Sequence, residues 1–251
     1  MTVHRLSFLA LALGLAACAA PAPVAPRDVV VEGGRQGPAS LGTTQLSPAE
    51  REAARTFIAV ARAVEPVAET ECINRAPRAN CDYRIVVDDR PDSPPNAFQT
   101  VDRRGRPIIA FTLTLIAGAE NADEMAFVMA HEAAHHILGH LERQREVATL
   151  GAQVFGQIAG AGGAGAEDIR RAQELGAIVG ARTYSREFEL EADGLGTFIA
   201  AQAGFDPVRG AGFFLRLPDP GDQFLGSHPP NDERFALVRR VALELGLGVG
   251  E

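Results

Sequence analysis

Apolar side chains recur at helical spacing soon after residue 50, where Phe57, Val60 and Val64 fall on one face. The preceding Ser47-Pro48-Ala49-Glu50 combines a capping box with proline at the first helical position. The pattern predicts a helix that begins near Pro48. It also predicts a break or kink near Pro66, because proline has no amide proton for an interior helical bond. We expect this helix to serve packing and not chemistry.

The next periodic segments predict a small sheet ahead of a second helix. Tyr83–Val87 is a β-branched run, and Ala97–Val101 and Pro107–Phe111 flank a polar turn as in a β-hairpin. An edge strand beside a cleft can hold a peptide in extended form. The pattern leaves open whether Ile108–Phe111 is such an edge.

Helical spacing returns after residue 121, where Asn121 and Glu124 stand in capping positions. Between Leu150 and Gly165 glycine and alanine dominate, and this composition predicts a mobile loop between helices. The segment is too short and too rich in glycine for a transmembrane helix.

Composition indicates one main globular domain. With 251 residues, 46% of them hydrophobic, the chain can bury one substantial core. All 24 basic residues are arginine, the formal net charge is −8, and no basic run occurs. Nucleic acid is therefore not an expected partner.

The first 46 residues have the features of an export signal and a tether. Residues 1–17 combine a short basic start with an apolar run, and Leu15-Ala16-Ala17-Cys18 resembles the lipobox of bacterial lipoproteins. An ordinary signal peptide with an incidental Cys18 is the alternative. Residues 18–46, rich in Pro, Ala and Gly, are expected to form a flexible tether, and residues 47–251 the folded domain.

Export also bears on the two remaining cysteines, Cys72 and Cys81. An oxidising compartment favours a disulfide between them. A role as metal ligands is disfavoured because their spacing is not of the CxxC type.

Four of the six histidines fall within residues 130–140. On a helix, His131 and His135 project side by side, because residues four apart differ by only about 40° in direction. Two imidazoles can then share a metal ion, and Glu132 can reach a water bound to it, as metal-assisted hydrolysis requires. A chance HExxH pattern on a solvated or core face is the alternative.

The third ligand is expected from a later helix. Leu138 and Leu141 stand where the metzincin pattern requires Gly and His, so that subclass is excluded. Glu189, Asp193 and Gly196 recur at helical spacing downstream, and the glycine permits close approach of a second helix. Glu189 could complete the metal site and Asp193 could orient a ligand histidine, unless these carboxylates belong to a solvated acidic face.

His136 and His140 form a further pair four residues apart, but no Glu follows His136. Their direction, about 100° or more from His135, favours structural hydrogen bonds or support of the ligand histidines.

HExxH followed by the pattern SRxxExEADxxG at residues 185–196 resembles the HtpX-like and CAAX-prenyl-endopeptidase-type zinc metallopeptidases. Within this gluzincin family, the lipobox and compact domain are most similar to the periplasmic lipoprotein members of LoiP and BepA type. The resemblance spans about residues 47–244. It implies an α+β, zincin-type domain, mostly helical, with a small β-sheet over the active-site helix.

The resemblance also implies roles for individual residues. His131, His135 and Glu189 would bind one Zn²⁺ per chain, Glu132 would be the general base, and Asp193 would orient a ligand. His140 matches the trailing histidine of the family's active-site helix, whereas Ala134 departs from the usual HExGH. Residues 226–234, with His228 and Arg234, resemble a later His-Pro…Arg element near the metal. We expect His228 to approach the zinc from a loop; a surface position or a transition-state donor is the alternative.

The implied activity is endoproteolysis of unfolded or misassembled cell-envelope proteins, by an enzyme that is lipid-anchored at the outer membrane and faces the periplasm. The alternative is a zinc-containing, chaperone-like assembly factor for outer-membrane proteins with weak or latent proteolysis. The sequence assigns no oligomeric state.

Overall fold

Helix α1 (Pro48–Arg75) begins the part of the chain that the computed structural model describes, which comprises residues 47–90, 93–183, 185–217 and 229–248. The capping box forms as expected, because the Ser47 hydroxyl accepts from the Glu50 amide and the Ser47 amide donates to the Glu50 carboxylate. The expected break at Pro66 is wrong, since α1 continues through it. Pro66 is exposed, so the carbonyl that loses its helical partner lies on the solvent side, where water satisfies it.

Within the described residues the sheet has three strands, β1 (Arg84–Asp88), β2 (Ala97–Val101) and β3 (Pro107–Thr112), in the order β1-β3-β2. β2 and β3 form the expected antiparallel hairpin, whereas β1 runs parallel to β3. β3 is therefore the central strand, and the question left open by the sequence is answered: Ile108–Phe111 is not an edge, and β2 is one.

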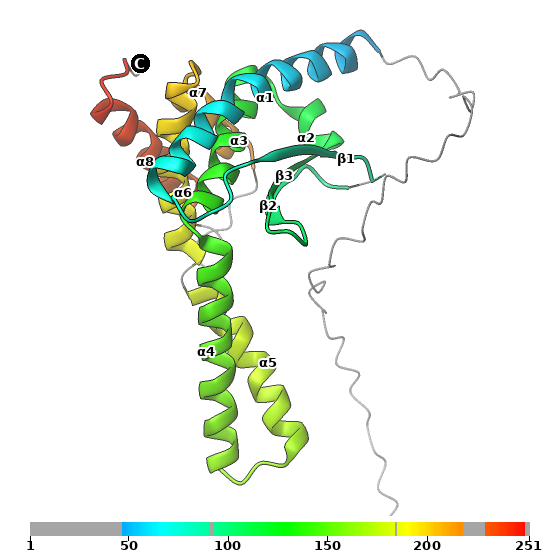
Figure 1. Ribbon diagram of the computed structural model, residues 1–251, viewed down its shortest axis with the longest axis vertical. Coiled ribbons are helices and arrows are strands. Elements are labelled where there is room, and N and C mark those ends of the chain that lie inside the picture. Colours follow the sequence, from blue (N-terminus) through cyan, green and yellow to red (C-terminus); the bar gives the residue numbers. More distant parts are fainter. Residues whose placement is uncertain (1–46, 91–92, 184, 218–228, 249–251) are drawn as a thin grey trace, which may run out of the picture. The chain divides into compact units, whose positions relative to one another are not determined.

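One hydrophobic core joins α1, the sheet, α3 (Ala122–Ile137) and α6 (Ser185–Gln202). Phe57 of α1 and Phe111 of β3 meet edge to face with ring centroids 5.2 Å apart. α2 (Leu113–Gly118) lies between the sheet and α3 in the chain and adds Leu115 and Ile116 to this core. Residues Gln45–Glu251 belong to one compact unit, in which the small sheet lies to one side, next to α1, α2 and α3 (Figure 1).

A second, smaller apolar cluster holds the C-terminal elements against α3. It contains Phe127 of α3, Ala211 of α7 (Pro207–Ala211), Phe214 of the 3₁₀ helix η1 (Gly212–Arg216) and Val238 of α8 (Asn231–Glu244). α8 is thereby brought beside α6 and α3, the two helices that carry the HExxH and ExxxD residues.

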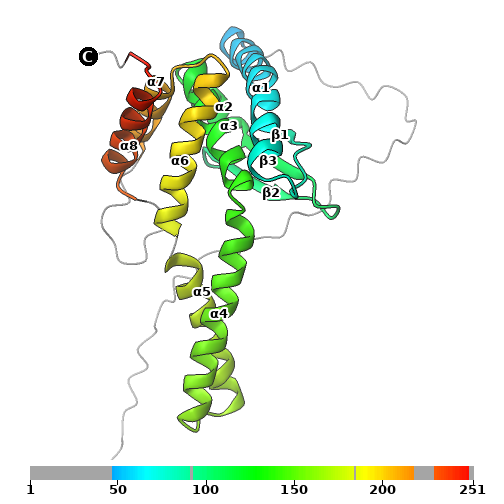
Figure 2. The same cartoon turned by 60° about the vertical axis from the view of Figure 1, so that its left-hand side comes forward.

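Helices α4 (His140–Ala161) and α5 (Ala166–Thr183) form a helical hairpin and lie side by side in both views (Figures 1 and 2). The expectation of a mobile loop from Leu150 to Gly165 is wrong for most of that segment, because it is helical as far as Ala161. Glycine serves here as a contact residue. A Cβ on Gly176 would lie 2.2 Å from the Gly151 carbonyl oxygen, so the two backbones touch directly.

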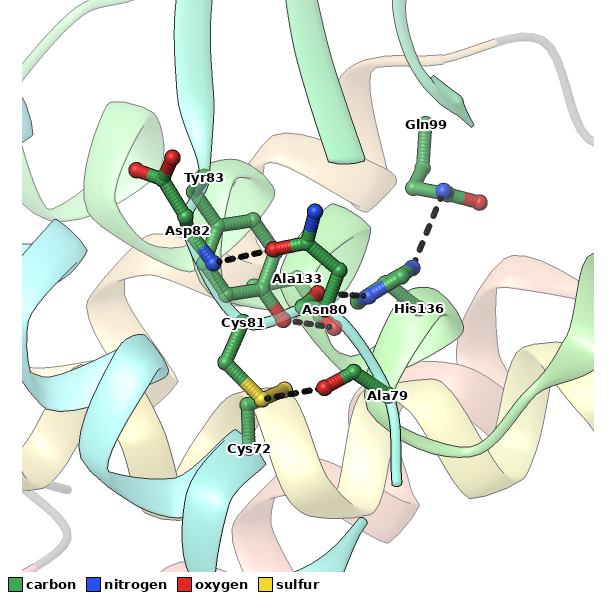
Figure 3. Close-up of a disulfide and its surroundings, with 9 residues drawn as sticks. All are labelled: Cys72, Ala79, Asn80, Cys81, Asp82, Tyr83, Gln99, Ala133 and His136. Carbon is green, nitrogen blue, oxygen red and sulfur yellow. Dashed lines mark hydrogen bonds between the residues drawn. A yellow bond between two sulfur atoms is a disulfide. The ribbon is translucent and has the colours of Figure 1, made fainter. Parts of the chain in front are cut away.

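A disulfide joins Cys72, near the end of α1, to Cys81 (Figure 3). The segment after it is tied to the active-site helix, because the buried Tyr83 hydroxyl donates to the Ala133 carbonyl at 3.2 Å. Among the described residues, no helix has both the length and the apolar character needed to cross a membrane.

We predict that Gly176→Ala loosens the α4–α5 hairpin, because its Cβ would overlap the Gly151 backbone; overpacking of this kind costs about 1–3 kcal/mol. Hydrogen exchange followed by mass spectrometry should show faster exchange of the α4 and α5 amides. Gly160→Ala is the matched control, since the nearest neighbour of its Cβ would be 3.7 Å away and alanine favours the helix by about 1 kcal/mol. Equal protection in both variants would contradict the direct backbone contact.

Candidate metal centre

Helix α3 presents His131 and His135 one turn apart on the face that meets α6. Their Nε2 atoms are 3.0 Å apart, and the rings meet edge to face with centroids 4.6 Å apart. His131 is buried and His135 is half-buried. The helical spacing therefore converges the two imidazoles on one point.

Helix α6 brings Glu189 to the same point. Its Oε2 lies 3.6 Å from His131 Nε2, and its Oε1 lies 3.4 Å from His135 Nε2. Ligands about 2.0–2.1 Å from a tetrahedral zinc ion are about 3.3 Å from one another. The two imidazole nitrogens are 3.0 Å apart and each lies 3.4–3.6 Å from a different oxygen of the Glu189 carboxylate, so the three side chains are close enough to share one ion, and they are a donor set that zinc accepts.

The close approach of α3 and α6 depends on Gly196. A Cβ at this position would be 3.0 Å from both the Cα and the amide nitrogen of His131. Any side chain there would push α6 away from α3, and Glu189 is carried on α6 two turns earlier. The small residue that the sequence pattern singled out is thus a packing requirement of the site.

A buried ion pair supports His131 from behind. Asp193 Oδ1 lies 2.9 Å from His131 Nδ1, and Arg234 of α8 donates two hydrogen bonds of 2.7 Å to the Asp193 carboxylate. Arg234 Nη2 also lies 3.3 Å from Glu189 Oε2. The Arg234 guanidinium also packs over the Phe214 ring at 3.8 Å, so both packing and charge hold Arg234 in place.

The electrostatics of this cluster favour an ionised Asp193. Burial alone raises the pKa of Asp193, but hydrogen bonds from Arg234 and His131 outweigh it and hold that pKa below the ordinary value. Burial lowers the pKa of His131, whereas the Asp193 and Glu189 carboxylates raise it, with a net rise to about 10. The proton that these carboxylates attract must leave His131 before its Nε2 can bind a metal.

His135 is supported by a different set of groups. Its Nδ1 lies 2.8 Å from Nδ1 of the buried His140, and His140 Nε2 lies 2.9 Å from the Glu191 carboxylate. Arg143 donates to the same carboxylate oxygen at 2.6 Å. Burial lowers the pKa of His140 to about 4, although Glu191 opposes this, so His140 is neutral near pH 7.

His136 points to the opposite side of α3, toward the disulfide segment (Figure 3). Its Nε2 lies 2.8 Å from the Asn80 carbonyl oxygen, its Nδ1 lies 3.4 Å from Gln99 of β2, and its ring meets Tyr83 edge to face. Burial lowers the pKa of His136. Its contacts join the active-site helix to the sheet and do not reach the metal ligands.

Glu132 lines a cleft of about 450 Å³ together with His131, His135 and Glu189. One wall of the cleft is the edge strand β2 with the residues before it, including Asn96 and Phe98. Another part of the lining is apolar and includes Leu115, Phe127, Val128, Phe213, Phe214 and Leu217, whereas Gln144, Ser185, Asn231 and Arg234 add polar side chains. A carboxylate beside three side chains that could hold a metal ion is suited to moving a proton during hydrolysis.

The structure therefore brings together His131, Glu132, His135, His140, Glu189, Asp193 and Arg234. Two expected sites, Cys18 and His228, lie outside the described residues. The supporting roles of Glu191, Arg143 and Tyr83 were not foreseen from the sequence. A usable signal existed for Arg143, which is three residues after His140 and so shares its helical face.

One helix carries the two histidines and a later helix supplies a carboxylate, an arrangement that fits a metallopeptidase. The sequence model of peptidase family M48 matches residues 55–242. The chain belongs to peptidase family M48. The family resemblance drawn from the paired motifs is thereby confirmed, as is the mostly helical α+β fold.

A curated relative is also similar. A Vibrio cholerae protein named "Putative beta-barrel assembly-enhancing protease" is 34% identical over 169 residues. The matched segment covers 60% of this chain and 34% of the relative, so the chain corresponds to only about a third of that protein's length.

We predict that Arg234→Met strongly destabilises the metal-free protein, because it removes the guanidinium that donates two hydrogen bonds to the buried Asp193 carboxylate and leaves His131 as the remaining partner; breaking a buried pair costs about 3–5 kcal/mol. Urea unfolding should show the loss near neutral pH. Because the folded-state pKa of Asp193 is lowered, the pair's contribution is present above the ordinary carboxyl pKa and disappears as pH falls through the lowered value.

Two further variants make that measurement specific. In the double variant Arg234→Met/Asp193→Leu the loss should be clearly smaller than the sum of the two single losses. Arg171→Met is the surface control, because its i,i+4 pair with Glu167 is solvent-exposed and contributes less than about 0.5 kcal/mol. Strict additivity of the two core substitutions would show that the ion pair is not coupled as described.

Proposed function

We propose that this protein is a zinc-dependent endopeptidase that hydrolyses peptide bonds in unfolded or misassembled cell-envelope proteins. The observation that carries the proposal is the convergence of His131, His135 and Glu189 beside Glu132 in one open cleft. Membership of a metallopeptidase family supports the same chemistry.

The proposed cofactor is one Zn²⁺ per chain, held by His131 Nε2, His135 Nε2 and the Glu189 carboxylate. Bound zinc would supply Lewis-acid chemistry, which polarises a carbonyl group and makes a water molecule acidic near pH 7. Three protein ligands leave one position of a tetrahedral site open for this chemistry.

The chain's own residues then have separate tasks. Glu132 takes a proton from the attacking water and passes it to the departing amine, which is general base and general acid catalysis by one carboxylate. Asp193 holds His131 with its Nδ1–H directed away from the metal position. Arg234 keeps Asp193 ionised, and so it acts on His131 through that carboxylate.

The shape of the cleft supports an extended, unfolded substrate. The Thr112 amide donates to the Asn96 carbonyl, so the backbone groups of every second residue from Asn96 onward bond to β3. The backbone groups of Ala97 and Gln99 lie between these residues and therefore face away from β3, toward the outer edge of the sheet. β3 is the only strand that pairs with β2 in the described part of the chain. A peptide in extended form can add to this edge, and the apolar wall can accept the large side chains that folded proteins bury.

The envelope setting rests on the sequence features at the N-terminus and on the relative. The lipobox at Cys18 would anchor the chain to a membrane, with the domain facing the periplasm, and Ala19 favours the outer membrane. The Vibrio cholerae relative is named for enhancing β-barrel assembly. Unfolded or misassembled envelope polypeptides are the proposed partners, with the lipid anchor as the membrane contact.

The ligand assignment predicts that Glu189→Ala abolishes stoichiometric zinc binding, because two imidazoles alone leave a labile site. Metal content of the purified domain, measured by mass spectrometry, should fall from one zinc per chain to well below one. Glu187→Ala on the same helix is the matched control, since Glu187 is exposed. Retained zinc in Glu189→Ala, with loss in the control, would overturn the assignment.

The proposed reaction predicts that Glu132→Gln binds zinc but no longer cleaves, because an amide cannot take the proton. Cleavage of unfolded casein by the zinc-loaded wild type should stop on chelation and return with zinc. A loss of about 10²–10⁴-fold in kcat is expected for the variant, the size of a typical general base contribution.

The same variant separates the enzyme from an assembly factor that binds clients without cleaving them. For an endopeptidase, Glu132→Gln should retain an unfolded outer-membrane protein that the wild type degrades. If wild type and variant both bind this client and neither degrades it in the presence of zinc, the protease proposal is wrong and the chaperone-like alternative stands.

A further inference from the structure

A chain of hydrogen bonds leads from His135 away from the cleft to the base of the α4–α5 hairpin. It runs from His135 Nδ1 to His140 Nδ1 over 2.8 Å, and from His140 Nε2 to Glu191 Oε2 over 2.9 Å. Arg143 Nη1 ends it with a 2.6 Å hydrogen bond to the same oxygen. We call His135, His140, Glu191 and Arg143 the relay.

The relay has only one consistent order of donors and acceptors when His135 is a metal ligand. His135 Nε2 then needs its lone pair for the metal, so the ring proton is on Nδ1 and is donated to His140 Nδ1. His140 Nδ1 must accept, so the proton of His140 is on Nε2 and is donated to Glu191. A carboxylate with no proton is the acceptor that fits this end, and Arg143 favours that charged state.

The meeting of His135 and His140 is not a consequence of helical spacing. Residues five apart on a regular helix point about 140° away from each other. Gly139 breaks the helix between them with a left-handed backbone of φ 67°, which glycine adopts without strain. The regular helical spacing is therefore interrupted between the two histidines, and His140, the first residue of α4, contacts His135.

Packing holds the outer members in place. The His140 ring stacks on Phe188 with centroids 4.6 Å apart and an interplanar angle of 11°. The Arg143 guanidinium packs on the same phenyl ring at 4.3 Å. Phe188 and Glu191 are both on α6, one turn apart, so this side of α6 fixes the ring and the carboxylate that His140 needs.

We propose that His140 and Glu191 are positioning residues for the metal site, which fix the tautomer and the direction of His135. This inference rests on the proposed function, because it requires a metal on His135 Nε2. It gives the two ligand histidines different supports: Asp193 contacts His131 directly in the core, whereas Glu191 reaches His135 only through His140. Partners of this kind typically change metal affinity by about 10–100-fold.

The test compares zinc dissociation constants, measured by competition with a chelating indicator, in variants that preserve packing. His140→Phe keeps a ring on Phe188 and removes both nitrogens. Glu191→Gln keeps an acceptor for His140 Nε2–H, whereas Glu191→Met keeps only the bulk. Glu187→Met on the same helix is the matched control, because Glu187 is exposed.

We expect His140→Phe to weaken zinc binding by about 10–100-fold and Glu191→Met to weaken it more than Glu191→Gln, with the control unchanged. A role in packing alone would affect Glu191→Gln and Glu191→Met alike. Imidazole ¹⁵N NMR of the zinc-loaded wild type gives an independent readout, because it should place the His140 proton on Nε2.

Wild-type zinc affinity in both His140→Phe and Glu191→Met would overturn the relay, as would a His140 proton on Nδ1 in the zinc-loaded protein. If His140→Phe does not fold, the zinc affinities of Glu191→Gln and Glu191→Met still test the relay. Glu191 is 43% exposed, so its substitution does not disrupt the core. A wild type that binds no zinc would contradict the proposed function itself, which is a different result from loss of affinity in the variants.

Discussion

The rest of the structure depends on the burial of one carboxylate, that of Asp193. This side chain is fully buried between α3, α6 and α8, where an unpaired charge would be prohibitively unfavourable. Arg234 on α8 and His131 on α3 are the two groups that satisfy it. The carboxylate therefore requires three helices from distant parts of the chain to meet, and the place where they meet is the candidate metal centre. The partners that Asp193 needs in order to be buried are thus the same residues that build the site.

The two ligand histidines differ in how far their support extends. The contacts that support His131 end at the Asp193–Arg234 pair, which is buried in the core beside Phe214. The contacts that support His135 end at Glu191 and Arg143, whose side chains are both about 43% exposed. A charge that is partly solvated binds its partner less strongly than a buried one, because water screens the interaction. The metal site thus joins a rigid inner support to an outer support that solvent and salt can weaken.

Much of this arrangement could be predicted because it is local. Capping at Ser47, the β2–β3 hairpin, the convergence of His131 and His135 and the need for a small residue at Gly196 all follow from spacing. The parallel pairing of β1 with β3 was not predictable, since it joins segments separated in sequence and periodicity carries no strand order. The helical hairpin was misjudged because glycine usually weakens helices, whereas here glycines let two backbones touch. Glu191 was hidden among three alternating glutamates, and its own partners, His140 and Arg143, lie on α4.

The α4–α5 hairpin lies between the two halves of the ligand set in the sequence, since His131 and His135 precede it and Glu189 follows it. A hairpin that only connected α3 to α6 would not affect the geometry of the site. It is not neutral here, because its first residue, His140, contacts a ligand and Arg143 in its first turn holds the carboxylate of the next helix. Gly139 interrupts the helix at this point with its left-handed backbone, and the glycine contacts hold α5 against α4 on the way back to α6. The hairpin's geometry and the orientation of His135 are therefore coupled through the first turn of α4. In the part of the chain that the structure describes, His140 and Arg143 are contacts through which the hairpin reaches the candidate ligand His135 and the neighbouring helix α6.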